Sequence, residues 1–141
     1  MKTNKKILSA GFLLVLISLV ACSFTTANIS SLKTSKDKAG NEQTSSFGVD
    51  DTVYGIAEVS NSPGKVKVKG RLAVDSVEGQ QSGPIPGLET MVELPSSGTA
   101  TFTFSPPNAG WPKGKYRLEV QMFDESGTQK DQKSADFSVS K

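Results

Sequence analysis

Residues 65–74 read KVKVKGRLAV, and apolar and basic residues alternate along almost all of this stretch. Valine, glycine and leucine fall on one side of an extended chain, and most of the residues on the other side are lysine or arginine. A period of two residues is typical of a β-strand with one face buried and the other in water. The stretch therefore predicts a strand that contributes to a hydrophobic core with Val66, Val68, Gly70, Leu72 and Val74.

Similar short runs occur on both sides of this stretch, separated by turns rich in glycine, proline, asparagine and serine. Runs of β-branched and aromatic residues between such turns predict further strands. They cover residues 51–60, 88–94, 99–105, 115–123 and 134–140. No segment shows a convincing helical period. We therefore expect an all-β, antiparallel sandwich of six or seven strands over residues 49–141.

A more specific pattern lies near the C-terminus, where GWPKGKYRLEV at residues 110–120 is followed by a polar turn and by ADFSV at residues 135–139. This pattern resembles the final hairpin of immunoglobulin-like domains in bacterial envelope proteins. The resemblance implies an immunoglobulin-like fold, without the cysteine pair of antibody-type domains. Alternation along the strand independently predicts that one face turns inward with Tyr116, Leu118, Val120 and Met122.

The N-terminus has the plan of a secretory signal: the basic start MKTNKK, an uncharged run over residues 7–20, and then small residues. The run is 14 residues long, whereas spanning a hydrocarbon core of about 30 Å takes about 20 residues of helix. We expect residues 1–21 to be a signal peptide. The alternative is an uncleaved membrane anchor.

Removing this leader changes the charge of the chain. The leader holds three of the 16 basic residues and none of the 14 acidic residues, which leaves 13 basic and 14 acidic residues from Cys22 onward. The formal charge of the mature chain is then −1. The basic isoelectric point of the whole chain therefore gives no reason to expect nucleic-acid binding.

Leu19, Val20, Ala21 and Cys22 stand at the exit of the leader. These four residues resemble the lipobox of bacterial prolipoproteins. The resemblance implies a diacylglyceryl group on the thiol of Cys22, cleavage before this residue, and fatty acylation of the new amine with a chain such as palmitate. The mature protein would then bind a lipid bilayer through Cys22. In the alternative interpretation, Cys22 is a small apolar residue at the end of a hydrophobic segment.

The residue after the cysteine is Ser23 and not aspartate. The lipoprotein resemblance then implies export to the outer membrane in a host with two membranes. In a host with one membrane, it implies the outer face of the cell membrane.

Residues 22–48 are rich in serine, threonine, lysine and asparagine, with scattered apolar residues. Such a composition buries little apolar surface, so we expect a lipidated flexible tether here.

The residue types limit the chemistry of the chain. It contains one cysteine and no histidine, which leaves no partner for a disulfide, a cysteine–histidine dyad, a histidine-based triad or a zinc site. We expect no metal, no cofactor and no enzymatic activity. Carboxylate pairs at residues 50–51 and 124–125 are expected in solvated turns, with a weak calcium site as the alternative.

Two basic rows follow from the strand alternation. One contains Lys65, Lys67, Lys69 and Arg71, and the other contains Lys113, Lys115 and Arg117. If adjacent, the rows would form a patch for anionic lipid headgroups or envelope polysaccharide. We favour the alternative, in which the lysines protect a sheet edge and the basic residues face the cross-strand partners Glu58, Glu89, Glu93 and Glu119.

Trp111 is the remaining candidate binding residue, because a loop tryptophan can stack on a sugar or a partner. We favour the alternative that it caps the end of the sandwich core.

These features favour a membrane-anchored, non-catalytic lipoprotein whose immunoglobulin-like domain engages a protein or polysaccharide of the cell envelope. One alternative is an enzyme inhibitor or adaptor that presents the predicted loop at residues 78–87 or at residues 105–114. Another is a small hydrolase.

Overall fold

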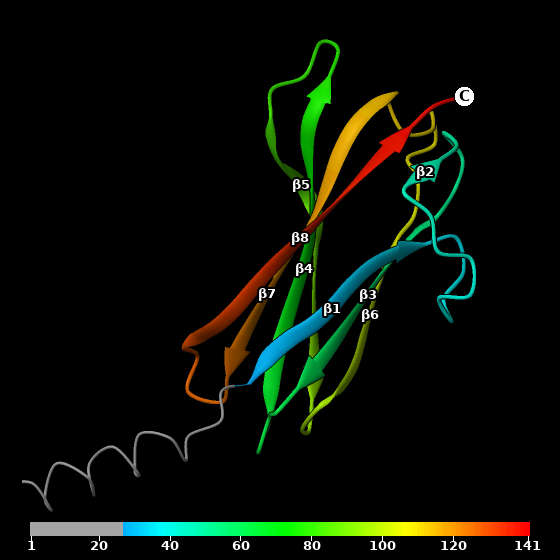
Figure 1. Cartoon of the computed structure of the whole chain (residues 1–141). Coiled ribbons are helices and arrows are strands. Elements are labelled where there is room, and N and C mark those ends of the chain that lie inside the picture. Colours follow the sequence, from blue (N-terminus) through cyan, green and yellow to red (C-terminus); the bar gives the residue numbers. More distant parts are fainter. Residues whose placement is uncertain (1–26) are drawn as a thin grey trace, which may run out of the picture.

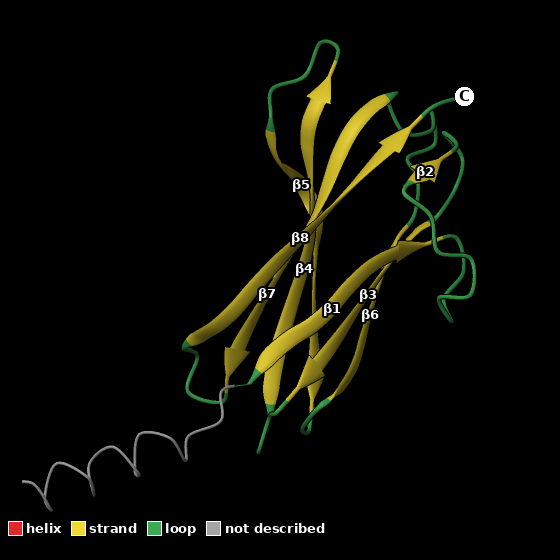
Figure 2. Cartoon of the chain, viewed as in Figure 1, coloured by secondary structure: helices red, strands yellow, loops and turns green. Residues whose placement is uncertain are grey.

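The computed structural model describes residues 27–141. Every regular element in this part of the chain is a β-strand (Figure 2). No helix within residues 27–141 is long and apolar enough to cross a membrane. The predicted signal peptide and the predicted lipidation site at Cys22 lie outside the described residues.

Eight strands form two sheets that pack against each other (Figure 1). The first sheet contains, in order, β1 (Asn28–Ser35), β3 (Val53–Ser60) and β6 (Gly98–Phe104). The second sheet contains, in order, β2 (Ser46–Phe47), β8 (Gln129–Val139), β7 (Gly114–Asp124), β4 (Val66–Val77) and β5 (Gly83–Leu94). Paired strands are antiparallel except β2 and β8, which are parallel. The predicted all-β, immunoglobulin-like sandwich is confirmed, with eight strands in place of six or seven.

The core lies between the two sheets, and the alternation of β4 and β7 supplies one half of it. The predicted inward residues Val66, Val68, Leu72, Val74, Tyr116, Leu118, Val120 and Met122 are all buried. The facing sheet contributes Val53, Ala57, Val59, Ala100, Phe102 and Phe104. Because fully burying a valine, leucine or phenylalanine side chain is worth about 1.5–3 kcal/mol, the match between these two faces is the main source of stability.

Two glycines allow the sheets to approach closely. A Cβ atom at Gly70 of β4 would lie 2.7 Å from the ring of Phe102 on β6. A Cβ atom at Gly55 of β3 would lie 2.6 Å from Leu118 on β7. The glycine in KVKVKG therefore faces the core as predicted, and it provides the space for an aromatic ring.

The prediction of a flexible tether is wrong for residues 28–48. β1 pairs with β3 along its length, and β2 pairs with the end of β8. Ile29 is fully buried and Phe47 is 2% exposed, so both belong to the core. The sandwich therefore begins near Asn28 and not at residue 49.

Polar side chains hold this N-terminal segment in place, which explains why its composition was misleading. Asp37 accepts hydrogen bonds from the Ser35 hydroxyl at 2.6 Å and from the backbone N–H of Glu42 at 2.7 Å. The Thr34 hydroxyl donates to the carbonyl of Thr44 at 2.5 Å. These bonds satisfy backbone and side-chain groups of the loop between β1 and β2, so a segment with few apolar residues still forms a defined structure.

β5 is also longer than predicted, because it begins inside the expected loop at residues 78–87. Ala73 pairs with Pro84 and Arg71 pairs with Glu89. Residues 85–88 therefore bulge opposite the single residue Leu72 of β4. The bulge contains Gly87 at φ 81°, a left-handed conformation that favours glycine.

The two ends of the sandwich differ. Ala27, the first described residue, lines a hollow of about 540 Å³ together with the β3–β4 turn and the β7–β8 turn. The C-terminus, the β4–β5 hairpin and the loop between β6 and β7 lie at the opposite end (Figure 1). The chain therefore enters the sandwich at one end and projects a hairpin at the other.

We expect Ile29→Ala to lower the free energy of unfolding by about 2–5 kcal/mol, because it leaves a cavity in the core. Urea denaturation followed by circular dichroism measures the change. Ser31→Ala is the matched control, since Ser31 is exposed on the same strand and its replacement should change the free energy by less than about 0.5 kcal/mol. Equal stability of the two variants would contradict a structural role for β1.

Candidate binding surfaces

The outer face of the five-stranded sheet carries most of the two predicted basic rows. Lys67, Lys69 and Arg71 lie on β4, and Lys115 and Arg117 lie on the neighbouring strand β7. Lys65 and Lys113 directly precede these strands and are exposed. Because β4 and β7 are antiparallel, Arg71 pairs with Glu119 and Ala73 pairs with Arg117. The two rows therefore follow each other along the sheet and do not lie side by side.

Acidic side chains compensate the charge of this face. Arg71 donates from Nε to Glu119 Oε1 at 2.8 Å. Arg117 contacts Asp75 at 3.4 Å and Asp136 at 3.3 Å. Lys69 lies 3.8 Å from Glu89, and Lys67 is directly opposite Glu93. The predicted cross-strand partners Glu89, Glu93 and Glu119 are confirmed.

The prediction that the basic residues face cross-strand glutamates and protect a sheet edge is wrong in two details. Glu58 lies on β3 in the other sheet, where it accepts a hydrogen bond from Thr99 at 3.0 Å. The lysines of β4 do not protect an edge, because β4 lies between β7 and β5. Side-chain alternation predicts which residues share a face, but it contains no information on which strands are neighbours.

The compensated face contains a shallow polar groove of about 290 Å³. It is lined by Arg71, Arg117, Glu119, Gln121, Gln132 and Ser134, among others. Carboxylates already engage both arginines, so Lys133 of the same lining carries most of the positive charge that remains in the groove.

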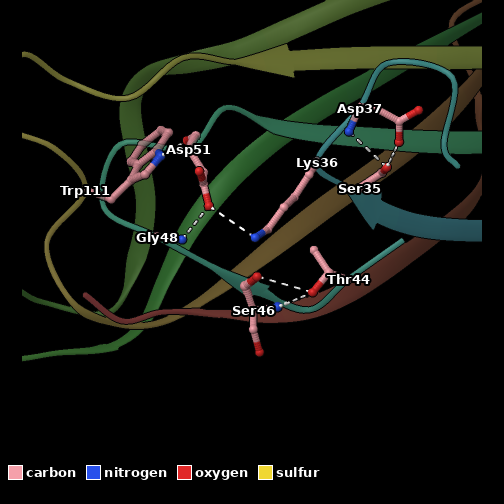
Figure 3. A network of polar contacts seen from close by, with 8 residues as sticks. All are labelled: Ser35, Lys36, Asp37, Thr44, Ser46, Gly48, Asp51 and Trp111. Atoms are coloured by element: carbon pink, nitrogen blue, oxygen red, sulfur yellow. Dashed lines mark hydrogen bonds and ion pairs between the residues drawn. The ribbon is translucent and has the colours of Figure 1, made fainter. Parts of the chain in front are cut away.

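Trp111, in the loop between β6 and β7, caps one end of the core and lies beside Asp51 (Figure 3). Its side chain is 4% exposed, and its indole N–H donates to the carbonyl of Asp51 at 2.7 Å. Its ring meets the ring of Tyr116 edge to face, with the centroids 6.3 Å apart. The interpretation of Trp111 as a cap is confirmed, and a buried indole has no free face on which a sugar could stack.

Tyr116 lies inside the core next to Trp111 and stabilises the same end of the sandwich. Its hydroxyl donates to the carbonyl of Pro112, four residues earlier, at 2.5 Å, and its ring stacks on Phe137 at a centroid distance of 5.4 Å. Burial raises the pKa of the Tyr116 hydroxyl. A tyrosine that bonds to backbone a few residues upstream at the crossing between sheets is a known corner motif of immunoglobulin-like domains. Strand alternation predicts the burial of Tyr116 but gives no signal for this hydrogen bond.

The two loops predicted to present a binding surface differ in how they are held. In the loop at residues 105–114, Gly110 and Trp111 are buried and the Trp111 N–H donates to the carbonyl of Val49 at 2.7 Å. By contrast, residues 78–82 are all exposed, at the tip of the β4–β5 hairpin (Figure 1). Of these two loops, the hairpin tip is the one that projects freely from the sandwich.

The carboxylate pairs lie in turns, as predicted. Asp124 accepts hydrogen bonds from the Ser126 hydroxyl at 2.6 Å and from the Thr128 N–H at 2.9 Å. These bonds, with a smaller contribution from Lys130, lower the pKa of Asp124. Asp51 accepts from the Gly48 N–H at 2.6 Å and lies 3.6 Å from Lys36 (Figure 3). These two carboxylates therefore stabilise local turns.

The loop between β1 and β2 contains a carboxylate of the same kind. Hydrogen bonds from Ser35 and from the backbone N–H of Glu42 lower the pKa of Asp37. Within residues 27–141, no group of three or more histidine, cysteine, aspartate or glutamate side chains is placed to hold a metal ion.

No protein-family model and no curated protein matches the chain. Among solved structures, it is similar to a Niemann-Pick type C2 protein from the Japanese carpenter ant, with a TM-score of 0.51 and 14% identity. That alignment covers 84% of this chain and 96% of the ant protein. The chain is also similar to a part of β-glucuronidase 2 from Bacteroides uniformis, with a TM-score of 0.52 and 14% identity. This second alignment covers 80% of this chain but only 14% of the enzyme. Similarity at this level shows the β-sandwich fold alone.

We expect Tyr116→Phe to lower the free energy of unfolding by about 1–3 kcal/mol, because the Pro112 carbonyl loses its donor in a part-buried position. The urea midpoint should fall while the slope of the transition stays constant. Tyr54→Phe is the control, since Tyr54 is partly exposed on the outer side of β3. Equal shifts in both variants would contradict the corner role of Tyr116.

The charge compensation of the sheet face is tested by replacing Glu89, Glu119 and Asp136 with their amides. This triple variant should elute from a sulfonated cation exchanger at higher salt than a control with Glu42, Glu78 and Glu125 replaced by glutamine. Both variants have the same net charge, but only the first removes the partners of Lys69 and Arg71 and one of the two partners of Arg117. Identical elution would show that the face forms no local basic patch even without these carboxylates.

Proposed function

We propose that this chain is a lipid-anchored protein of the bacterial cell envelope whose immunoglobulin-like sandwich is a non-catalytic binding module. The resemblance of residues 19–22 to a lipobox supports the anchor. Two or three acyl chains on Cys22 would hold the protein firmly, because each buried methylene contributes about 0.8 kcal/mol.

The observation that carries this proposal is the position of β1. It begins at Asn28, so five residues separate Cys22 from the first strand. Six residue steps from Cys22 to Asn28 span at most about 22 Å when fully extended. A lipid on Cys22 would keep the Ala27 end of the sandwich close to the bilayer, and the β4–β5 hairpin would point away from it (Figure 1). Such an arrangement suits a domain that presents a surface to a partner in the envelope.

The chemistry of the sandwich supports binding more than catalysis. The carboxylates that could have formed an acid–base pair instead accept hydrogen bonds in turns. The buried Trp111 offers no aromatic platform for a sugar, which favours a protein partner over a polysaccharide. Ser23 supports an outer-membrane location in a host that has an outer membrane.

A second candidate function is an inhibitor or adaptor that presents a loop to an enzyme in the same compartment. The exposure of residues 78–82 at the hairpin tip favours it. Alanine substitutions at Glu78, Gln80 and Gln81 should abolish inhibition or partner capture in that case and leave the stability of the sandwich unchanged. Gly79 is kept, because its φ of 79° favours glycine.

The anchor is tested by Cys22→Ser in the producing cell. We expect the protein to move from the membrane fraction to the soluble or secreted fraction and to lose incorporation of labelled palmitate, because the thiol is the attachment point for diacylglycerol. Ser23→Ala is the matched control and should remain in a membrane. Retention of the Cys22→Ser variant in the membrane fraction would overturn the anchor proposal.

A further inference from the structure

The two sides of the sandwich are closed differently. On one side, β1 lies beside β8, and the Ile29 N–H donates to Asp131 Oδ2 at 2.8 Å. On that side β2 also pairs with the end of β8. On the other side, β5 ends the five-stranded sheet and β6 ends the three-stranded sheet. β5 and β6 therefore each have one edge with no neighbouring strand in residues 27–141.

These two open edges differ in how much apolar surface they leave uncovered. On β6, the inward residues Ala100, Phe102 and Phe104 are at most 3% exposed, so an additional strand would bury little more. On β5, the inward residues Leu88 and Val92 are only partly buried. Met91, on the outer face of β5, is 53% exposed and is the one exposed large hydrophobic residue in the described part of the chain. A strand added to β5 would cover apolar surface on both faces.

The backbone of β5 is suited to pairing only in its second half. Pro84 and Pro86 lack an N–H group, which protects the first half of the edge against strand addition. Residues 88–94 contain no proline and pair regularly with β4 from Glu89 to Leu94. Alternate residues of an edge strand direct their N–H and C=O groups away from the sheet. Residues 88–94 therefore form a seven-residue template for another strand.

Acidic side chains determine which strand fits this template. Glu89 and Glu93 flank Met91 on the outer face, and both are exposed. A second copy that paired antiparallel about Met91 would place Glu89 opposite Glu93 twice, and like charges directly opposite each other are destabilising. The edge therefore disfavours self-pairing in this register.

β4 shows which pattern β5 accepts. Across the sheet, Lys67, Lys69 and Arg71 lie opposite Glu93, Met91 and Glu89. By register the two outer cations face the two glutamates, while Lys69, opposite Met91, contacts Glu89 at 3.8 Å and Met91 stays 53% exposed. A strand on the open side of β5 meets the same three side chains.

We propose that residues 88–94 of β5 form a docking edge for an extended segment of a partner protein. The segment carries cationic residues at two positions four residues apart, an apolar residue midway between them, and β-branched apolar residues on its other face. Main-chain hydrogen bonds supply the affinity, and the Glu89–Met91–Glu93 row supplies the specificity. This inference names the partner chemistry of the proposed binding module and depends on that proposal, but it does not depend on the lipid anchor.

The probe is the peptide Thr-Lys-Val-Leu-Val-Lys-Thr, and the control is the same peptide with both lysines replaced by glutamate. The full chain, purified in detergent micelles, is studied by amide hydrogen exchange with and without each peptide. We expect the lysine peptide to slow exchange at residues 88–94 and the glutamate peptide to have no effect. Equal effects of the two peptides, or protection at β6 or residues 78–82 in place of β5, would overturn the inference.

Charge reversal on the edge gives a second, independent test. Glu89→Lys with Glu93→Lys should weaken binding of the lysine peptide at least tenfold and create binding of the glutamate peptide. The matched control, Glu42→Lys with Asp50→Lys, makes the same change in net charge at exposed positions away from residues 88–94, and its affinity should stay within twofold of the original. If the β5 variant fails to fold, the comparison of the lysine and glutamate peptides on the unaltered chain still tests the docking edge.

The outcomes also separate this inference from the proposed function. If the hairpin variants at residues 78–82 lose an envelope partner while β5 shows no protection, the docking edge is wrong and the binding module stands. If the peptide tests succeed but Cys22→Ser stays in the membrane, the docking edge stands and the anchor is wrong.

Discussion

The structure depends on the close approach of two sheets at Gly70 and Phe102. The ring of Phe102 occupies the space that a Cβ atom at residue 70 would need. Gly55 and Leu118 make the reciprocal contact from the opposite sheet. Because a bulky side chain at either glycine would force the sheets apart, these contacts set the separation at which all the inward valines and leucines pack. The corner formed by Trp111 and Tyr116 then closes one end of this core.

The same packing explains where the molecule remains open. The sheet of three strands cannot cover all of a sheet of five strands, so one edge of the larger sheet is less fully covered. Leu88 and Val92 lie in that margin and remain partly exposed. The wider sheet thus leaves apolar surface at its edge that the core itself does not use.

Much of this fold could be predicted from the sequence, because it depends on alternation over neighbouring residues. The inward faces of β4 and β7 followed directly from residues 65–74 and 115–123. The composition of residues 28–48 predicts a tether because apolar residues are few, but side-chain hydrogen bonds to the backbone, such as those of Asp37, stabilise the segment together with the buried Ile29 and Phe47. The first half of β5 was missed because its glycines and prolines have the composition of a loop, while β4 nonetheless pairs with Gly83 and Pro84.

The candidate binding surfaces are harder to predict from the sequence than the fold. Whether a row of lysines forms a basic patch depends on which strands are neighbours and in which register, and both are non-local properties of the fold. Here the register places Glu119 opposite Arg71 and Glu89 close to Lys69, so the charges of the face satisfy one another. A partner that covered this face would have to desolvate existing ion pairs, which costs free energy. A partner strand at the edge of β5 would instead satisfy backbone groups that no strand of residues 27–141 uses, and for this reason the edge is better suited to binding than the charged face.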